Sequence, residues 1–339
     1  NTGYTFTGNV TITGNVSNNA KQRFVRADAM GDAVVVVANN TINNYMASDA
    51  DYIKVTNGNN VTVENNTMTR AINADSTTTL AQFTDIFANG GSIFLKENVT
   101  IDTSSNKNIT VGGDVNIYAD DNVTIYFPKT TVFGGDGTIT VHGGKIKTPQ
   151  ELCISGDSKL VIDGGEHTFG AFSATGNGTI VVNDGVLNCK GSYAGVMGIS
   201  FGETGSLYVN GGKLNMYQPF NLNANRCDAA YIEINGGTIE LLDGMADMFV
   251  VRNVMDKDVT SGVSRGSSIK ITGGTFIAHY EVDSDNDATS FIRNGDPNDT
   301  NKVLVSNIKD NYNCVVTGGT FYGSWQRADN TRYENCDGL

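Results

Sequence analysis

The most regular feature of this chain is a short pattern of alternating apolar residues that recurs seven times between residues 138 and 322. Each copy begins with two apolar residues separated by one position, followed by a polar residue. A Gly-Gly or Asp-Gly pair comes next, and a second alternating apolar run follows the pair. The glycines that end these pairs are Gly144, Gly165, Gly185, Gly212, Gly237, Gly274 and Gly319. Their spacing ranges from 20 to 45 residues, and a minimum near 20 with variable excess predicts stacked coils that carry side loops.

Each copy predicts two short strands that meet at a bend, because side chains alternate across a strand and glycine supplies the positive φ of a sharp turn. The apolar positions should point inward and stack from coil to coil. Before the bend they are Ile139, Val141, Leu160, Ile162, Ile180, Val182, Leu207, Val209, Ile232, Ile234, Ile269, Ile271, Cys314 and Val316. After the bend they are Ile146, His167, Leu187, Leu214, Ile239, Phe276 and Phe321. A row suited to hydrogen bonds between coils precedes the glycines: His142, Asp163, Asn183, Asn210, Asn235, Thr272 and Thr317.

A coil of about 20 residues is too short for a βαβ unit, which needs about 30. The pattern therefore predicts an all-β parallel solenoid. Upstream, Leu80, Phe83 and Phe87 share one face of a helix expected over residues 79–89, with Gly90 as its stop signal. A short amphipathic helix followed by the strand segment GSIFLKENVTID resembles the opening of right-handed parallel β-helix proteins of the pectin-lyase-like superfamily. This resemblance covers residues 77–323 and implies the fold alone, because many activities share it.

Residues 1–76 form a strand-rich N-terminal extension outside this repeat, and two interpretations of it stay open. Its strands can form a small sheet or irregular first coils packed on the rod. Alternatively, residues 1–17 form an extended strand that adds to the sheet edge of a neighbouring subunit. The residues expected to mediate that assembly are Tyr4, Phe6, Val10, Ile12 and Val16. At the other end, inserts are expected at 243–265 and 279–312, and a C-terminal cap over 324–339.

The composition indicates which classes of partner the protein binds and where it is located. The 339 residues carry a formal charge of −13, and the 23 basic residues are scattered, which argues against nucleic acid. No apolar run approaches the roughly 18 residues of a membrane span, so we expect no membrane insertion. Sequons favour an extracellular, cell-surface location, and the candidate glycosylation sites are Asn9, Asn15, Asn60, Asn98 and Asn122.

The five cysteines show no CxxC pair and no metal-ligand spacing. Cys189 and Cys314 fall on inward positions, where a thiol acts as a small hydrophobe. Alternatively, Cys314 and Cys336, about one coil apart, form a disulfide that closes the C-terminal end.

Asp283, Asp285 and Asp287 have the alternate spacing of a calcium loop, so calcium is the one cofactor that the sequence suggests. The match ends at Ala288 and Asn294, where an EF-hand loop needs glycine and glutamate, and a solvated acidic loop is the alternative. With only three histidines, no histidine-based nucleophilic or metal cluster can be assembled, and we expect no catalytic residue.

These observations favour a non-enzymatic extracellular structural protein, a β-solenoid subunit of a cell-surface filament, sheath or surface layer that self-associates through its N-terminal strand. One alternative is an adhesin or glycan-binding module that uses the late loops. The other is a polysaccharide lyase or glycoside hydrolase.

Overall fold

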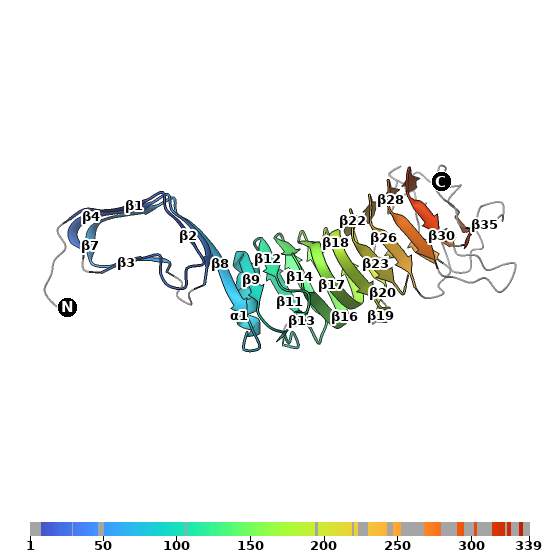
Figure 1. Cartoon of the computed structure of the whole chain (residues 1–339), viewed down its shortest axis with the longest axis horizontal. Coiled ribbons are helices and arrows are strands. Elements are labelled where there is room, and N and C mark those ends of the chain that lie inside the picture. Colours follow the sequence, from blue (N-terminus) through green and yellow to red (C-terminus); the bar gives the residue numbers. More distant parts are fainter. Residues whose placement is uncertain are drawn as a thin grey trace, which may run out of the picture.

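Parallel strands stacked from coil to coil form most of the molecule. The computed structural model describes residues 8–28, 30–46, 51–105, 107–193, 196–218, 220–222, 230–242, 247–251, 268–278, 290–294, 302–303, 314–322, 324–326 and 332–334. Within these residues the chain is a right-handed parallel β-solenoid of about eight turns, which confirms the predicted fold. The molecule is elongated, with the N-terminal strands at one end and the late coils at the other (Figure 1).

The rod has three faces, each built from one segment of every coil. The first face contains β9 (Gly91–Leu95), β12 (Val115–Tyr118), β15 (Thr138–Val141), the start of β17 (Lys159–Ala174) and of β18 (Thr179–Cys189), β22 (Ser206–Val209), β25 (Tyr231–Ile234), β28 (Ser268–Ile271) and β32 (Cys314–Val316). The second contains β10 (Val99–Thr100), β13 (Thr124–Tyr126), the start of β16 (Lys145–Gly156), later parts of β17 and β18, β23 (Lys213–Met216), β26 (Thr238–Leu241), β29 (Thr275–Ala278) and β33 (Thr320–Tyr322). The third contains β11 (Asn108–Val111), β14 (Thr131–Gly135), the ends of β16 and β17, β21 (Ile199–Phe201), β24 (Phe220–Leu222), β27 (Asp247–Val251) and β30 (Ser290–Asn294).

The bend between the first and second faces occurs at the repeated glycines, as predicted. All seven have φ between +70° and +113°. Gly212 shows why a side chain is excluded there: a Cβ atom would lie 2.7 Å from the carbonyl oxygen of Gly185 in the preceding coil. The close stacking of the bends thus requires both positive φ and the absence of a side chain.

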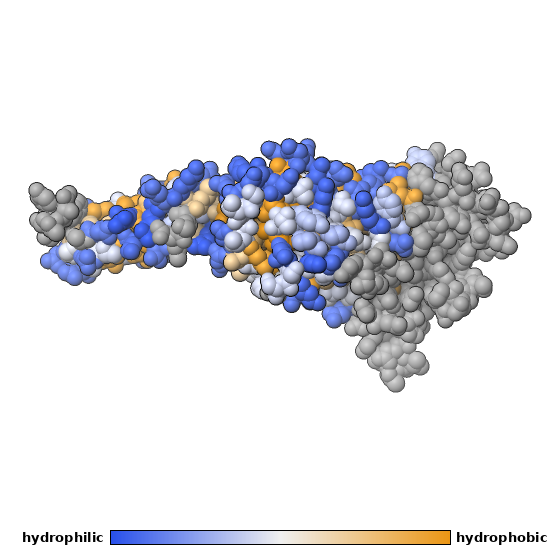
Figure 2. Space-filling model, turned by 90° about the horizontal axis from the view of Figure 1, so that it is seen from below, coloured by the Kyte–Doolittle hydropathy of each residue, from blue (hydrophilic) through white to orange (hydrophobic). Residues whose placement is uncertain are grey.

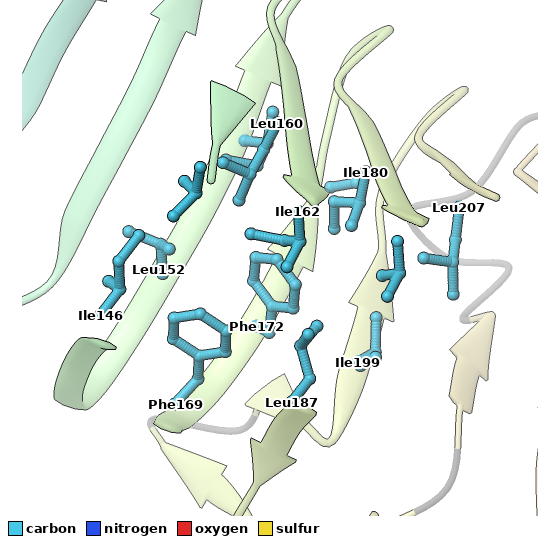
Figure 3. Close-up of a cluster of buried hydrophobic side chains, with 14 of the residues drawn as sticks. Ile146, Leu152, Leu160, Ile162, Phe169, Phe172, Ile180, Leu187, Ile199 and Leu207 are labelled. Atoms are coloured by element: carbon cyan, nitrogen blue, oxygen red, sulfur yellow. The ribbon is translucent and has the colours of Figure 1, made fainter. Parts of the chain in front are cut away.

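The predicted inward positions form the core. Leu160, Ile180 and Leu207 lie in register on the first face, and all three are fully buried. Figure 3 shows them with residues of the other two faces, including Leu187 and Phe172, gathered in the interior. Burial confirms the predicted ladders except at the last coil, where Val316 is only partly buried and the side chain of Cys314 lies outside the described residues.

Helix α1 (Leu80–Asn89) closes the start of the rod, and its bounds agree with the sequence prediction. The Thr79 hydroxyl oxygen caps the N-terminus by accepting a bond from the backbone amide of Gln82, and Oε1 of Gln82 accepts one from the backbone amide of Thr79. Gly90 follows the last residue of the helix. Phe83 and Phe87 are fully buried, and the ring of Phe87 stacks on Phe133 of β14 with centroids 5.0 Å apart. The helix therefore covers the apolar interior that the first coil would otherwise expose.

The strands before α1 also form stacked coils. They are β1 (Val10–Thr13), β4 (Gly31–Ala38) and β7 (Gly58–Glu64) on one side; β2 (Val16–Asn18), β5 (Thr41–Tyr45) and β8 (Thr67–Ala74) on a second; β3 (Val25–Ala27) and β6 (Ile53–Val55) on a third. We call this set the N-terminal stack. Its small core is separate from that of the rod and includes Val35 and Val37. The two parts are joined through β8, whose start pairs with β5 and whose end pairs with β9.

Short antiparallel pairs complete the fold: β19 (Ser192–Tyr193) with β20 (Val196–Met197), β31 (Lys302–Val303) with β30, and β34 (Ser324–Gln326) with β35 (Arg332–Glu334). Most of the expected inserts at 243–265 and 279–312 lies outside the described residues. The described parts of both inserts contribute β27 and β30 to the third face.

Candidate functional site

The N-terminal edge of the molecule is formed by β1, where the assembly residues Val10 and Ile12 lie. They pair in register with Val35 and Val37 of β4, so this strand belongs to a coil of its own chain. Among the described strands, none pairs with the other edge of β1. Val16, at the start of β2, is 66% exposed. Tyr4 and Phe6 lie outside the described residues. The edge can accept a further strand, because its outward backbone groups have no strand partner in the described chain.

Three asparagines form a ladder at the corner between β1 and β2 and its equivalents in the next two coils. The Oδ1 atom of Asn40 accepts bonds of 3.0 Å from both the backbone amide and the side-chain amide of Asn15. Asn40 in turn donates to Asn66 from its backbone amide at 3.1 Å and from Nδ2 at 2.8 Å. Asn40 is only 1% exposed. The ladder fixes the coil-to-coil register of the stack, since each amide is used by its neighbour.

An outward row of side chains runs along the first face of the rod, next to the bend. It contains Phe94, Tyr118, His142, Asp163, Asn183, Asn210, Asn235 and Thr272, and we call it the outward row. Asn183 donates to Asp163 at 2.8 Å and Asn210 donates to Asn183 at 2.9 Å, which confirms the predicted coil-to-coil hydrogen bonds. At the far end, the Thr317 hydroxyl bonds the carbonyl of Ile271 at 3.4 Å rather than continuing the row.

The row begins with aromatic rings that the sequence prediction did not include. Tyr118 stacks on Phe94 with ring centroids 5.3 Å apart and on His142 with centroids 4.6 Å apart. Nε2 of His142 lies 3.0 Å from Oδ1 of Asn116, and Nδ1 lies 3.6 Å from a carboxylate oxygen of Asp163. Both faces of the Tyr118 ring are covered by neighbours, so this ring presents an edge rather than a stacking platform to solvent.

One polar cluster on the first face brings together groups that could transfer protons. The Tyr231 hydroxyl donates to Glu233 at 2.8 Å, and the Lys270 ammonium donates to the same carboxylate at 2.8 Å. The bond from Lys270 lowers the pKa of Glu233, while partial burial and the Glu233 carboxylate raise the pKa of Tyr231 to about 12. A carboxylate already bonded twice is a weak base, and a tyrosine with this pKa stays protonated near neutral pH, so we assign the cluster a structural role.

His167 occupies the inward position that the ladder alignment assigned to it, and it is fully buried. Its Nδ1 accepts from the backbone amide of Ile146, and its Nε2 lies 2.8 Å from the carbonyl oxygen of Gly164. Burial lowers the pKa of its imidazole. The side chain is therefore a neutral, hydrogen-bonded histidine of the core.

Cys153 and Cys189, the two cysteines whose side chains the structure describes, are free thiols. Cys189 is fully buried on the second face, as predicted, and burial raises its pKa to about 12. Cys153 is buried on the third face, and burial also raises its pKa. The backbone of Cys314 pairs with Ile269, whereas its side chain and Cys336 lie outside the described residues, so the disulfide stays a prediction.

The candidate calcium residues Asp283, Asp285 and Asp287 also lie outside the described residues. Across the parts of the chain that are described, no three His, Cys, Asp or Glu side chains gather closely enough to hold a metal ion.

The five candidate glycosylation sites are all exposed: Asn9, Asn15, Asn60, Asn98 and Asn122. Two of their side-chain amides already donate within the chain. Nδ2 of Asn15 bonds the Thr13 carbonyl at 3.1 Å, and Nδ2 of Asn60 bonds the Asp32 carbonyl at 3.1 Å. Because a glycan would be attached at this nitrogen, modification of either residue would disturb one of these bonds.

Among the residues that the structure describes, no helix combines the length and the apolar character that a bilayer span requires. Comparisons with models of known protein families, with curated protein sequences and with solved structures found no match for this chain.

Proposed function

We propose that this chain is a non-enzymatic structural protein of the cell exterior, a β-solenoid subunit of a filament, sheath or surface layer. The observation that carries the proposal is the edge of β1, which has a strand partner on one side only among the described residues. A protein that avoids association blocks such an edge with charge, proline or a covering segment. The described strand, VTIT, has neither charge nor proline.

The surface chemistry supports the same proposal. The polar groups of the outward row are used for bonds between neighbouring coils, as are those of the asparagine ladder. The polar side chains of these two rows thus hold one coil on the next, as a rigid rod requires.

The alternative of an adhesin or glycan-binding module rests on the loops at 243–265 and 279–312. The enzymatic alternative, a polysaccharide lyase or glycoside hydrolase, requires catalytic groups that lie together at a polysaccharide-binding surface. Both predict a monomer, and this separates them from the assembly proposal.

Electron microscopy of the purified full-length chain over a concentration series tests the proposal. We expect ordered polymers whose number grows with concentration. Isolated rods at every concentration, together with binding in a glycan screen or release of reducing or unsaturated sugar ends from a polysaccharide, would replace it with one of the alternatives.

A further inference from the structure

In the N-terminal stack, the sheet of β1, β4 and β7 ends at β7, and this strand is left with an open edge. It pairs with β4 on one side, and among the described strands none pairs with its other side. In Figure 1, β7 lies with β1 and β4 at the end of the molecule far from α1, so the rod does not cover it. The N-terminal stack therefore presents two unpaired edges, β1 at one end and β7 at the other.

The apolar ladders of the stack run out into solvent at β7. Val61 and Val63 continue the ladders of Val35 and Val37, respectively. The two residues of β4 are fully buried, whereas Val61 is 38% exposed and Val63 is 48% exposed. Apolar residues are visible at the surface of this part of the molecule in Figure 2. A further coil stacked on β7 would bury both valines as β7 buries those of β4.

The backbone of β7 is also oriented for a further strand. Asn39 donates to the carbonyl of Glu64 at 3.2 Å, so the backbone groups of Glu64 point toward the β4 side. Successive residues of a strand direct their backbone groups to opposite edges. The amides and carbonyls of Val61 and Val63 consequently point to the open edge.

The asparagine ladder specifies what would fit there. Nδ2 of Asn40 donates to the carbonyl of Ile12, and Nδ2 of Asn66 donates to the carbonyl of Val37. The equivalent carbonyl in the third coil belongs to Val63, and an asparagine of a fourth coil would complete the series. In each coil of the stack, the asparagine lies three residues after the apolar residue of the ladder. The first coil has this spacing, between Ile12 and Asn15, and its strand β1 still has an open edge.

We propose that the open edge of β7 binds the β1 edge of a second copy of this chain, parallel and in the register that the stack already uses. Val10 and Ile12 of the second copy then lie beside Val61 and Val63, and its Asn15 extends the ladder beyond Asn66. The two surfaces differ, so the contact is head-to-tail and can repeat from copy to copy, which builds a filament when the rotation between copies does not close a ring. This inference rests on the proposed function, for which it names the partner and the interface.

The test uses full-length variants in which one edge carries a charge. Val63→Asp alters the β7 edge and Ile12→Asp alters the β1 edge, both at positions that are partly exposed in the single chain. Val34→Asp is the matched control, because Val34 is 44% exposed on β4 but lies outside the ladders. Thr11→Pro is a second β1 variant that removes an edge amide and leaves the β4 side unchanged. Circular dichroism checks that each variant keeps its β structure.

Sedimentation velocity should show that the Val63→Asp and Ile12→Asp chains each stay monomeric at concentrations at least tenfold above those at which the wild type and Val34→Asp polymerise. Mixed in equal amounts, the two edge variants should form a dimer that grows no further, since each supplies the intact edge that the other lacks.

Polymerisation of both edge variants like the wild type would overturn the β7–β1 contact and leave the proposed function standing. Dimers of Ile12→Asp alone would overturn it in favour of pairing between two β7 edges. A wild type that stays monomeric would count against both proposals.

Discussion

The Nδ1 atom of His167 accepts a hydrogen bond from the backbone amide of Ile146, 3.0 Å away in the preceding coil. An accepting Nδ1 carries no proton, so Nε2 carries it and donates to Gly164. Protonation of the ring would break the bond to Ile146 and place a charge in the core. The equivalent positions of the next coils hold Leu187 and Leu214, which need no such bonds.

Stability should therefore fall in mild acid because of His167. Burial lowers the folded-state pKa of His167 below its ordinary value of 6.5, so the unfolded chain takes up the proton first. The free energy of unfolding should decrease as the pH falls below 6.5, by up to about 1.4 kcal/mol per pH unit from this group, until the folded-state pKa is reached.

Urea unfolding of the wild type and of His167→Leu between pH 8 and pH 5 measures this contribution. At pH 8 the variant should be less stable by about 1–3 kcal/mol, because two buried backbone groups lose a partner, and the gap should narrow toward pH 5. A constant gap across the range would contradict the assignment.

Asn40 should be the most sensitive position of the asparagine ladder. Its side chain accepts from Asn15 and donates to the Ile12 carbonyl and to Asn66 while almost fully buried. Replacement by alanine should destabilise the N-terminal stack by about 1–3 kcal/mol. Asn40→Asp should cost more at neutral pH, because a carboxylate would face the Ile12 carbonyl, and should recover part of the loss on protonation.

Amide hydrogen exchange in β1, β4 and β7 follows this local loss directly. Asn18→Ala, at an exposed position in β2, is the control and should change the exchange rates little. Equal effects of the two alanine variants would show that the ladder adds nothing beyond surface hydrogen bonds.

A pair of glycines separates backbone strain from contact between coils. Gly212 and Gly14 have nearly the same φ, +71° and +69°. A Cβ atom at Gly212 would meet the Gly185 carbonyl oxygen at 2.7 Å, whereas at Gly14 it would meet nothing within 4 Å. Gly14→Ala should cost about 1 kcal/mol from strain alone, and Gly212→Ala should cost clearly more. Amide hydrogen exchange of the strands flanking each glycine measures the destabilisation caused by each substitution. Equal destabilisation at the two sites would show that the stacked bends can move apart freely.

The helix that closes the rod should also be essential to its first coil. Phe87→Ala removes the ring that stacks on Phe133 and should lower the free energy of unfolding by about 3–5 kcal/mol. Thr84→Ala on the same helix, at a half-buried position away from that contact, should change it by less than about 1 kcal/mol. Thermal unfolding followed by circular dichroism compares the two.

Much of the rod could be predicted from the sequence because its strands obey simple periodicities. The alternation around Gly212 placed Leu207, Val209 and Leu214 inside, and the pattern around Phe83 and Phe87 gave the helix. The third face was missed, since its apolar pairs, such as Ile199 and Phe201, are followed by turns of variable sequence rather than by a constant glycine pair.

For the N-terminal stack, the sequence left a small sheet and irregular first coils as open alternatives, and the regularity of its coils was not predicted. The bends of the stack use asparagines, whereas the repeat of the rod is marked by glycines. The recurrence of Asn15, Asn40 and Asn66 at intervals of 25 and 26 residues is the signal that could have revealed the stack. Its two open edges follow from the pairing of strands that are distant in the sequence, and a local sequence pattern does not predict that pairing.

The direction of the strand-to-strand hydrogen bonds has a mechanical consequence. In the rod these bonds run along its length, because each coil sits on the one before it (Figure 1). Tension between the two ends would load them along their own direction and release coils one after another. Each coil of about 20 residues would then add about 70 Å of extended chain. A layer or fibre built from such rods would yield by lengthening in steps and absorb work before any subunit came apart.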